Sequence, residues 1–326
     1  MIQLKYPKFW SSINWISSLL IPFSYVYRGL GWLRGKLTKK IILPGKVICI
    51  GNITVGGAGK TQVAIWLAKM LKLQNSSFAI VTKGYKSNIS QAVLVEGYHK
   101  AVEVGDESVI LKNFGPVIAT KKIIHALKII RQLSPQILIF DDGMQNPSIK
   151  KDFNILVFDS LSAIGNRRIF PAGPLREDLD AGLKKADLIL MIGNQECSDF
   201  SLLNSIYFTG KPYFRARIKL ITNLDSDIQY IAFAGIGNPE KFYSLLEENN
   251  CKIKNRISFA DHHYYLESDL KKLINLANSQ NCLLITTEKD YTKLNDYYKN
   301  LIICAKVVLE LEDEQEVINL INEKLL

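Results

Sequence analysis

Short apolar runs alternate with stretches of helical periodicity along most of the chain. The apolar runs are bounded by turn-forming or acidic residues and predict buried strands at 46–53, 78–82, 92–95, 136–142, 154–159 and 187–192. Apolar positions recur at helical spacing in 62–71 and 121–131, which predicts helices. Strands that alternate with helices form a parallel sheet covered on both faces, so we expect a doubly wound α/β fold. Another strand, glycine turn and helix at 228–242 predict a second, smaller α/β unit.

The first forty residues have a different pattern. Residues 9–33 are rich in aromatic and aliphatic side chains, and a helix through them would carry one apolar stripe. The stripe consists of Phe9, Ile13, Ile16, Leu20 and Phe23. We expect an amphipathic helix that lies in the membrane interface, with its aromatic side chains at the depth of the lipid headgroups. These aromatic residues are Trp10, Trp15, Tyr25, Tyr27 and Trp32.

Basic side chains surround this apolar segment. All thirteen charged side chains before Glu96 are Lys or Arg, so the net charge of +10 comes from the N-terminal end. Lys5 and Lys8 precede the segment, and further cations follow it from Arg34 onward. Cations beside an apolar segment favour an anionic membrane surface, whereas nucleic acid calls for a polar basic stripe, so we expect no nucleic-acid partner.

Two alternatives for this segment remain open. It could be a helix pair packed on the body of the same protein, or a single short N-terminal membrane anchor. Pro22 and Arg28 interrupt the run, which argues against an uninterrupted span of about 20 apolar residues. The five cysteines are scattered without C-x-x-C spacing, which argues against disulfides or a zinc site and for a reducing cytoplasm.

A glycine-rich loop joins the first predicted strand to the helix after it. Strand, glycine turn, Lys-Thr and helix is the context of a P-loop, in which backbone N–H groups cradle phosphates. Lys60 is expected to reach the β- and γ-phosphates of ATP, and the Thr61 hydroxyl to bind Mg²⁺. The nucleotide-binding residues are therefore Thr54, Val55, Gly56, Gly57, Ala58, Gly59, Lys60 and Thr61.

Two aspartates follow another buried strand. Asp141 and Asp142 end the apolar run at 136–142, as in a Walker B strand, whose acidic residue holds Mg²⁺. Such a strand places them at the carboxyl edge of the sheet, where α/β proteins bind ligands. A P-loop identifies only a nucleoside triphosphate. The run from Thr287 to Asp290 lacks the spacer of the guanine-binding Asn-Lys-x-Asp motif, which disfavours a GTPase.

At this point the sequence resembles the tetraacyldisaccharide 4'-kinases. The resemblance rests on segments that run in order along the chain: 51–61, 104–107, 141–145, 171–177, 234–239, 261–262 and 286–290. Thr54, in place of the first P-loop glycine, is itself the family's form of the loop. A Ser-Arg-Gly-Tyr segment of the family appears here with Lys83 in the arginine position.

The resemblance implies catalytic roles for particular residues. Asp106 looks like the base that accepts the sugar hydroxyl proton, and His262 like the group that hydrogen-bonds and orients it. Glu107 looks like a further Mg²⁺ partner beside Thr61, Asp141 and Asp142. Other active-site positions carried over from the family are Gln145, Arg176, Glu177 and Asp261. From the residues alone, a solvated turn at Asp106 and a helix cap at Asp261 remain open.

The resemblance also implies the reaction. We expect transfer of the γ-phosphate of ATP, with Mg²⁺, to the 4'-hydroxyl of a tetraacyldisaccharide 1-phosphate, the glycolipid precursor of lipid A. We place the protein peripherally on the cytoplasmic face of the bacterial inner membrane, with no obligate protein partner. A membrane-associated P-loop ATPase that drives a protein partner, and a soluble small-metabolite kinase, are the alternatives.

The chain is expected to divide into three parts. Residues 1–40 would form the membrane-associated helical segment, 41–215 the P-loop kinase domain, and 216–326 a smaller α/β domain. Because Lys60 and His262 fall in different domains, we expect the active site in the cleft between them.

Overall fold

The larger part of the protein is built on a nine-stranded sheet. The computed structural model describes residues 7–162 and 164–325, and Lys5, expected as a flanking cation, lies outside them. The strand order is β13-β8-β7-β6-β1-β5-β2-β4-β3. The seven inner strands are parallel, and only the outermost strands β3 and β13 run antiparallel to their neighbours. The strands are β1 (Lys46–Gly51), β2 (Phe78–Thr82), β3 (Val93–Leu94), β4 (Val117–Ala119), β5 (Ile137–Asp141), β6 (Phe153–Asp159), β7 (Leu188–Ile192), β8 (Tyr213–Leu220) and β13 (Val307–Leu311).

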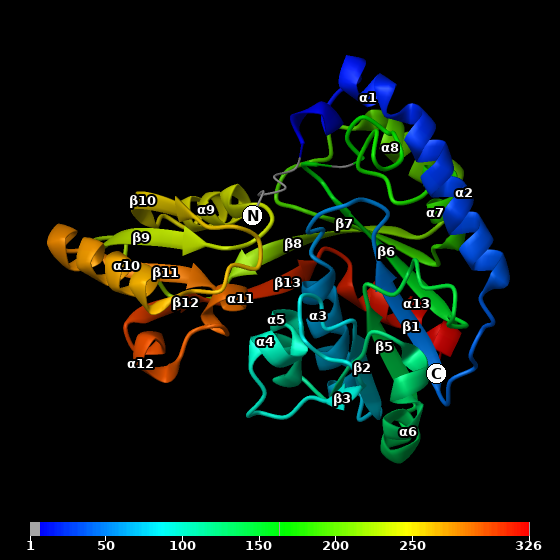
Figure 1. Ribbon diagram of the computed structural model, residues 1–326, viewed down its shortest axis with the longest axis horizontal. Coiled ribbons are helices and arrows are strands. Elements are labelled where there is room, and N and C mark those ends of the chain that lie inside the picture. The colour runs from blue at the N-terminus through cyan, green and yellow to red at the C-terminus, as the bar shows by residue number, and fades with distance from the viewer. Residues whose placement is uncertain (1–6, 163, 326) are drawn as a thin grey trace.

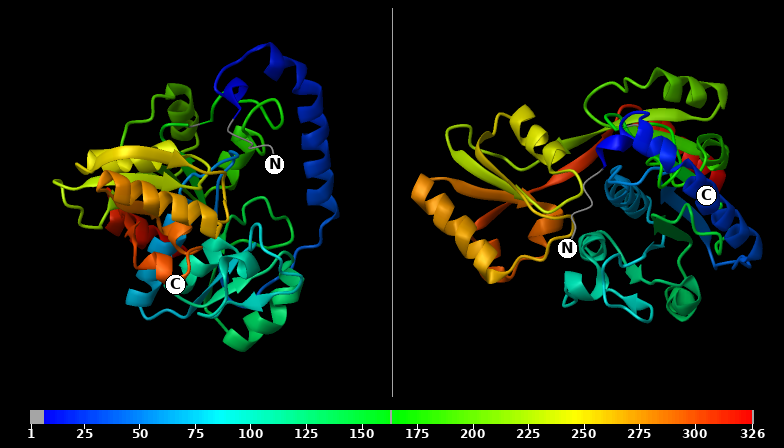
Figure 2. Two further views of the ribbon diagram at one scale, coloured as in Figure 1. Left: turned by 60° about the vertical axis from the view of Figure 1, so that its left-hand side comes forward. Right: turned by 45° about the horizontal axis from the view of Figure 1, so that its top comes forward.

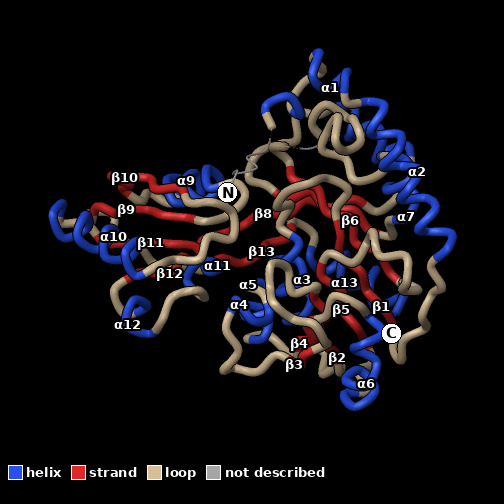
Figure 3. The backbone as a smooth tube through the Cα atoms, in the orientation of Figure 1, coloured by secondary structure: helices blue, strands red, loops and turns tan. Residues whose placement is uncertain are grey.

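Helices cover both faces of this large sheet (Figures 1 and 3). One face packs on α3 (Lys60–Leu73), α5 (Asp106–Lys112) and α13 (Glu314–Leu325). The other face packs on α6 (Ile123–Leu133), α7 (Leu179–Lys185) and α8 (Phe200–Phe208). Because both faces are covered, the inner strands are continuous apolar runs with nearly every side chain buried. The expected doubly wound α/β fold is confirmed.

A smaller parallel sheet, at the left of Figure 1, follows along the chain. Its strand order is β10-β9-β11-β12. The strands are β9 (Gln229–Ala234), β10 (Lys252–Ser258), β11 (Leu283–Thr287) and β12 (Ile302–Ala305). The helices that accompany them are α9 (Pro239–Glu248), α10 (Glu267–Gln280), α11 (Glu288–Tyr291) and α12 (Asp296–Lys299).

The last strand and helix of the chain return to the large sheet. Strand β13 pairs with β8, and Val317 and Ile321 of α13 are buried in the core beside β6 and α3. The small sheet is therefore inserted between β8 and β13. The division into domains at 41–215 and 216–326 stays a prediction, and these two returning elements belong by packing to the large sheet.

The N-terminal segment is broken into short helices. They are η1 (Lys8–Trp10), α1 (Trp15–Leu19) and α2 (Ile21–Leu37), so the expectation of one continuous helix is wrong. Pro22 stands in the first turn of α2, the position in a helix where its missing N–H costs nothing, and so a new helix begins here. Within residues 7–162 and 164–325, no helix has the length and apolar content needed to cross a bilayer.

Trp10 does not lie where the sequence places it. It is buried, its indole Nε1 donates to the Pro171 carbonyl at 2.9 Å, and its ring packs edge-on against Phe170. Its expected position at headgroup depth is therefore wrong, because its apolar surface and its N–H both find partners in the protein. The other four aromatic residues are exposed, with Trp15 at 75% and Tyr27 at 39%.

Small polar residues attach the segment to the body. Ser17 and Ser24 are buried, and the Ser24 hydroxyl donates to the Ile169 carbonyl at 2.7 Å. The large apolar side chains point away from the body, Leu19 at 67% and Phe23 at 62% exposed. The segment is thus packed on the body of the protein and presents apolar side chains outward, while its contact with a membrane stays a prediction.

Candidate active site

The glycine-rich loop connects β1 to α3 at the carboxyl edge of the large sheet. Gly59 has φ +85°, in the left-handed region, and the next residue starts α3. The backbone therefore favours glycine, and a Cβ there would also lie 3.0 Å from Cδ1 of Ile192, whose side chain would have to shift. Lys60 Nζ donates to Asn52 Oδ1 at 2.9 Å, which holds the lysine over the loop.

A second segment supports the loop from outside. Val55 N–H donates to the Pro174 carbonyl at 2.8 Å, and Arg176 N–H to the Ile53 carbonyl at 2.6 Å. Thr54 forms a β-bridge with Leu175. The family segment at 171–177 therefore supports the loop and also brings the Arg176 side chain to the site.

Asp141, at the end of β5, faces the loop. The Thr61 hydroxyl donates to Asp141 Oδ2 at 3.3 Å, and Oδ1 is buried without a hydrogen-bond partner among the described residues. Burial and the nearby Glu107 charge raise the pKa of Asp141 to about 7, although Lys60 acts against them. An unpartnered buried carboxylate oxygen beside a P-loop hydroxyl fits a bound cation.

Asp142 is surrounded by cations. Its carboxylate lies 3.0 Å from Arg176 Nη1, 3.4 Å from Lys83 Nζ and 3.5 Å from Lys60 Nζ. Burial by itself would raise the pKa of Asp142, but Lys60, Arg176 and Lys83 hold it well below the ordinary value. Asp142 therefore stays ionised and ties these cations to the loop.

Gln145 and Glu177 form an outer layer of the same site. Gln145 Nε2 donates to the Asn52 carbonyl at 2.7 Å, and Gln145 Oε1 accepts from Arg176 at 3.4 Å. Glu177 accepts from Gln145 at 3.4 Å and forms an ion pair with Lys185. Gln145 therefore contacts Asn52 and Arg176 directly, whereas Glu177 is connected to them only through Gln145.

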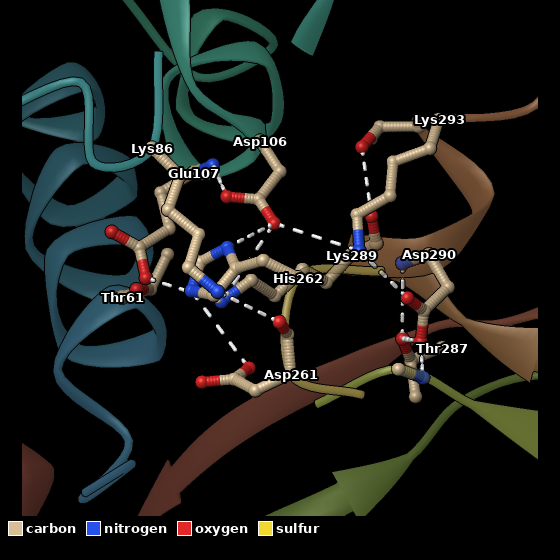
Figure 4. Close-up of polar contacts among 12 residues, drawn as sticks. Thr61, Lys86, Asp106, Glu107, Asp261, His262, Thr287, Lys289, Asp290 and Lys293 are labelled. Atoms are coloured by element: carbon tan, nitrogen blue, oxygen red, sulfur yellow. Dashed lines mark hydrogen bonds and ion pairs between the residues drawn. The ribbon is translucent and has the colours of Figure 1, made fainter. Parts of the chain in front are cut away.

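Asp106 and His262 meet across the two sheets (Figure 4). Asp106 is the first residue of α5, and His262 follows β10, with φ +58°. Their side chains are both nearly buried, and His262 Nδ1 lies 2.8 Å from Asp106 Oδ2. The remaining Asp106 oxygen accepts the N–H of Glu107 at 3.0 Å. The contact that the family resemblance implies is therefore present.

Two lysines complete this cluster. Lys289 Nζ lies 3.2 Å from His262 Nε2, 3.5 Å from Glu107 Oε1 and 3.8 Å from Asp106 Oδ2. Lys293 Nζ lies 3.7 Å from Asp106 Oδ2. An ammonium only donates, so its contact assigns the lone pair of His262 to Nε2 and the proton to Nδ1, which donates to Asp106.

Charge in this cluster favours ionised forms. Burial would raise the pKa of Asp106, but the His262 hydrogen bond, Lys289 and Lys293 lower it below the ordinary value. Burial would lower the pKa of Lys289, but Glu107 and Asp106 raise it. Asp106 is thus an ionised acceptor at neutral pH.

The side chain of Asp261 lies at the edge of this cluster. Its carboxylate is about half exposed, and Oδ1 lies 3.8 Å from His262 Nε2. Its backbone carbonyl accepts from Lys86 Nζ at 2.9 Å. This hydrogen bond connects the turn that holds His262 to a residue that follows β2 of the large sheet. It connects the two sides of the site more through its backbone than through its acid group.

Five contributing residues were not assigned from the sequence: Asn52, Lys83, Lys86, Lys289 and Lys293. Lys289 lies in the family segment at 286–290, which ends β11 and begins α11. The carboxyl ends of neighbouring parallel strands lie at the same edge of a sheet. Because β9 and β11 are neighbours, knowledge of their pairing would have indicated Lys289, which follows β11, as a site residue. That pairing cannot be read from one sequence.

The described residues contain no group of three or more His, Cys, Asp or Glu side chains that would hold a metal by itself. Mg²⁺ in phosphoryl-transfer sites does not need one, because it is usually held by one or two carboxylates, substrate phosphates and water. The Thr61 hydroxyl and the Asp141 carboxylate fit that arrangement.

Comparison with known proteins agrees with this geometry. The family model described as "Tetraacyldisaccharide-1-P 4'-kinase" matches residues 16–326. The chain belongs to this family. Its relatives include the tetraacyldisaccharide 4'-kinases of Rickettsia canadensis and Rickettsia akari, each 45% identical over 100% of this chain and 98% of theirs. The LpxK structure of Aquifex aeolicus in complex with ATP is 29% identical, with a TM-score of 0.76 over 95% of this chain and 100% of that one.

Proposed function

We propose that the protein is an ATP-dependent kinase that phosphorylates the 4'-hydroxyl of a tetraacyldisaccharide 1-phosphate. Family membership over the whole length supports the reaction. The observation that carries the mechanism is the Asp106–His262 contact at 2.8 Å, made between the two sheets. Glu107, the neighbour of Asp106, links this acceptor to the glycine-rich loop, because its charge acts on Asp141, which accepts from Thr61.

The loop residues bind and align ATP. The N–H groups from Thr54 to Thr61 surround the β- and γ-phosphates, with Lys60 reaching the phosphate that moves. Thr61 and Asp141 would hold Mg²⁺, and Glu107, whose charge acts on Asp141, would add to the negative surroundings of the metal. The metal, when bound, neutralises charge that develops on the phosphate oxygens. Arg176 and Lys83, both paired to Asp142, are placed to meet further phosphate charge.

Asp106 accepts the proton of the 4'-hydroxyl as that oxygen approaches the γ-phosphorus. A weak base suffices, because phosphoryl transfer has a loose transition state and depends mainly on alignment. His262, with its proton on Nδ1, fixes the Asp106 carboxylate, and Lys289 fixes His262. Since these groups come from both sheets, the arrangement is complete only when the two sides are together, which limits hydrolysis of ATP by water.

We further propose that the protein works on the cytoplasmic face of the inner membrane. Its acceptor carries four acyl chains, and α1 and α2 present exposed apolar side chains with only basic charges among them. Such a segment binds the interface of an anionic bilayer without spanning it.

The test uses γ-labelled ATP, the purified chain and the disaccharide 1-phosphate lipid in detergent, beside Lys60→Ala. The expected result is label in the lipid with the wild type and none with the variant. Label released only as free phosphate would overturn the kinase and favour an ATPase that drives a partner.

A further inference from the structure

Helix α8 presents three aromatic side chains that the protein does not bury. Phe200 is 77% exposed, Tyr207 80% and Phe208 83%, whereas Leu202 and Ile206 are buried in the core. Spacings of seven and eight residues place the three aromatic side chains on one face of the helix. Burying an aromatic side chain contributes on the order of 2 kcal/mol, so a face of three indicates a contact outside the chain.

The same loop fastens α8 and α1. Arg167 Nη2 lies 2.6 Å from the carboxylate of Asp199, the residue that caps α8. Arg168 Nη1 donates to Ser17 at 2.8 Å and to Ser18 at 3.0 Å in α1. Two consecutive arginines of one loop therefore contact both helices, and Figure 1 and the left view of Figure 2 show both helices at the top of the molecule, apart from each other.

Further exposed apolar side chains lie on α1, on α2 and in the loop that contacts both α1 and α8. Trp15, Leu19 and Phe23 of α1 and α2 are more than half exposed, and Leu161 in the intervening loop is 58% exposed. We call this surface, together with the three aromatic residues of α8, the apolar end. Its members are Trp15, Leu19, Phe23, Leu161, Phe200, Tyr207 and Phe208.

Charge at the apolar end identifies the occupant as a lipid bilayer. Helix α8 has no charged residue between Phe200 and Phe208, and its capping Asp199 is neutralised by Arg167. The charged residues of α1 and α2 are all basic. Aromatic side chains on an uncharged helix, beside cations, are typical of proteins that lie in the interface of an anionic membrane.

We propose that α8 is a second membrane-contact element, whose aromatic face enters the headgroup region of an anionic bilayer beside α1 and α2. The proposal builds on the membrane attachment proposed above and adds a helix about 180 residues further along the chain. Two elements that are fastened by the same loop would bind together, so each would strengthen the binding of the other.

The test is flotation of the full chain with vesicles of phosphatidylcholine and phosphatidylglycerol. The variant F200S/Y207S/F208S is compared with L73S/Y297S/L301S, whose exposed side chains lie in α3, α12 and the turn after α12. We expect the first variant to bind vesicles on the order of tenfold or more weakly, and the control to bind like the wild type. Wild-type flotation of the α8 variant would overturn the proposal.

A single change guards against misfolding of the triple variant. Phe208→Glu adds a charge at an 83% exposed position and is expected to weaken vesicle binding by itself. Phosphorylation of detergent-dispersed acceptor is expected to be unchanged in all these variants. If the wild-type protein itself does not phosphorylate the acceptor, the proposed function fails, whereas the membrane contact of α8 is judged by flotation alone. If the wild type sediments as a dimer that F200S/Y207S/F208S dissociates, the face binds a second copy and the proposal fails.

Discussion

Replacing Lys289 with Met tests whether the dyad of Asp106 and His262 depends on a third residue. The change removes the donor that lies 3.2 Å from His262 Nε2 and a positive charge 3.8 Å from Asp106 Oδ2. His262 then loses the contact that fixes its tautomer. Lys293, 3.7 Å from Asp106, remains as the nearest cation.

The magnitude follows from the contacts that are lost. A hydrogen bond that involves a charged group contributes about 1.5–3 kcal/mol. If that energy serves to hold the dyad in its reactive geometry, kcat/KM falls by about tenfold to a hundredfold. Among the described residues, Lys289 forms no hydrogen bond with the loop at 54–61, so the KM for ATP is expected to change little.

The pH dependence gives a second readout. Lys289 lowers the pKa of Asp106, so its loss raises that pKa and moves the acidic limb of the kcat/KM profile toward neutral pH. The variant therefore loses more activity between pH 8 and pH 5 than the wild type.

The assay is steady-state phosphorylation of the lipid acceptor in detergent from pH 5 to pH 8. Lys271→Met is the matched control, because among residues 7–162 and 164–325 the ion pair of this lysine is with Glu267, on the surface of α10. Wild-type kcat/KM in Lys289→Met at both ends of the pH range would refute the role of Lys289, whatever the result for Asp106.

Three further predictions concern the base, the metal and the N-terminal segment. Asp106→Asn keeps the shape but cannot accept a proton, so kcat is expected to fall by about 10²–10⁴-fold with ATP binding retained in a filter assay; unchanged kcat would remove Asp106 as the base. Because the pKa of Asp141 is raised to about 7, Mg²⁺ must displace a proton below that pH, and its apparent affinity is expected to rise about tenfold per pH unit up to 7 and then level off; titrations at pH 6, 7 and 8 that superimpose would contradict this. Trp10→Ala is expected to lower the free energy of unfolding by about 3–5 kcal/mol in urea, whereas Trp15→Ala leaves it within about 0.5 kcal/mol and weakens vesicle binding; equal stability losses would show that both side chains are packed alike.

Much of the large sheet follows from hydrophobic pattern. The buried runs around β1, β5, β6 and β7 were long enough and apolar enough to be placed within one or two residues. The glycine loop and the helix after it follow from local chemistry, because Gly59 needs a left-handed backbone before Lys60 can start α3. These features depend on residues close together in the sequence.

The features that the sequence did not predict depend on contacts between residues far apart in the chain. The aromatic-rich pattern of residues 9–33 placed Trp10 at headgroup depth, but the Pro171 carbonyl and the Phe170 ring, about 160 residues later in the chain, bury it in the protein. The return of β13 to the large sheet has no signal in its own sequence, since a strand at a sheet edge is specified by its partner.

The site divides in the same way. Asp141, Lys60 and Thr61 were predicted from a local motif, whereas the Asp106–His262 contact could be expected only from resemblance to a family. Lys289 and Lys293 remained unassigned, because their closeness to Asp106 arises from the docking of the small sheet against α5. The position of these lysines in the site therefore depends on tertiary structure and cannot be predicted from their own segment.

The central claim is that the phosphate moves from ATP to one hydroxyl of the glycolipid. The most direct measurement is phosphorus–proton correlation NMR of the lipid product made by the wild-type protein. The account predicts a second phosphomonoester whose phosphorus couples to the proton on the 4' carbon, and its absence with Lys60→Ala. A phosphorus signal on another sugar hydroxyl, or a diphosphate at the position of the existing phosphate, would contradict it.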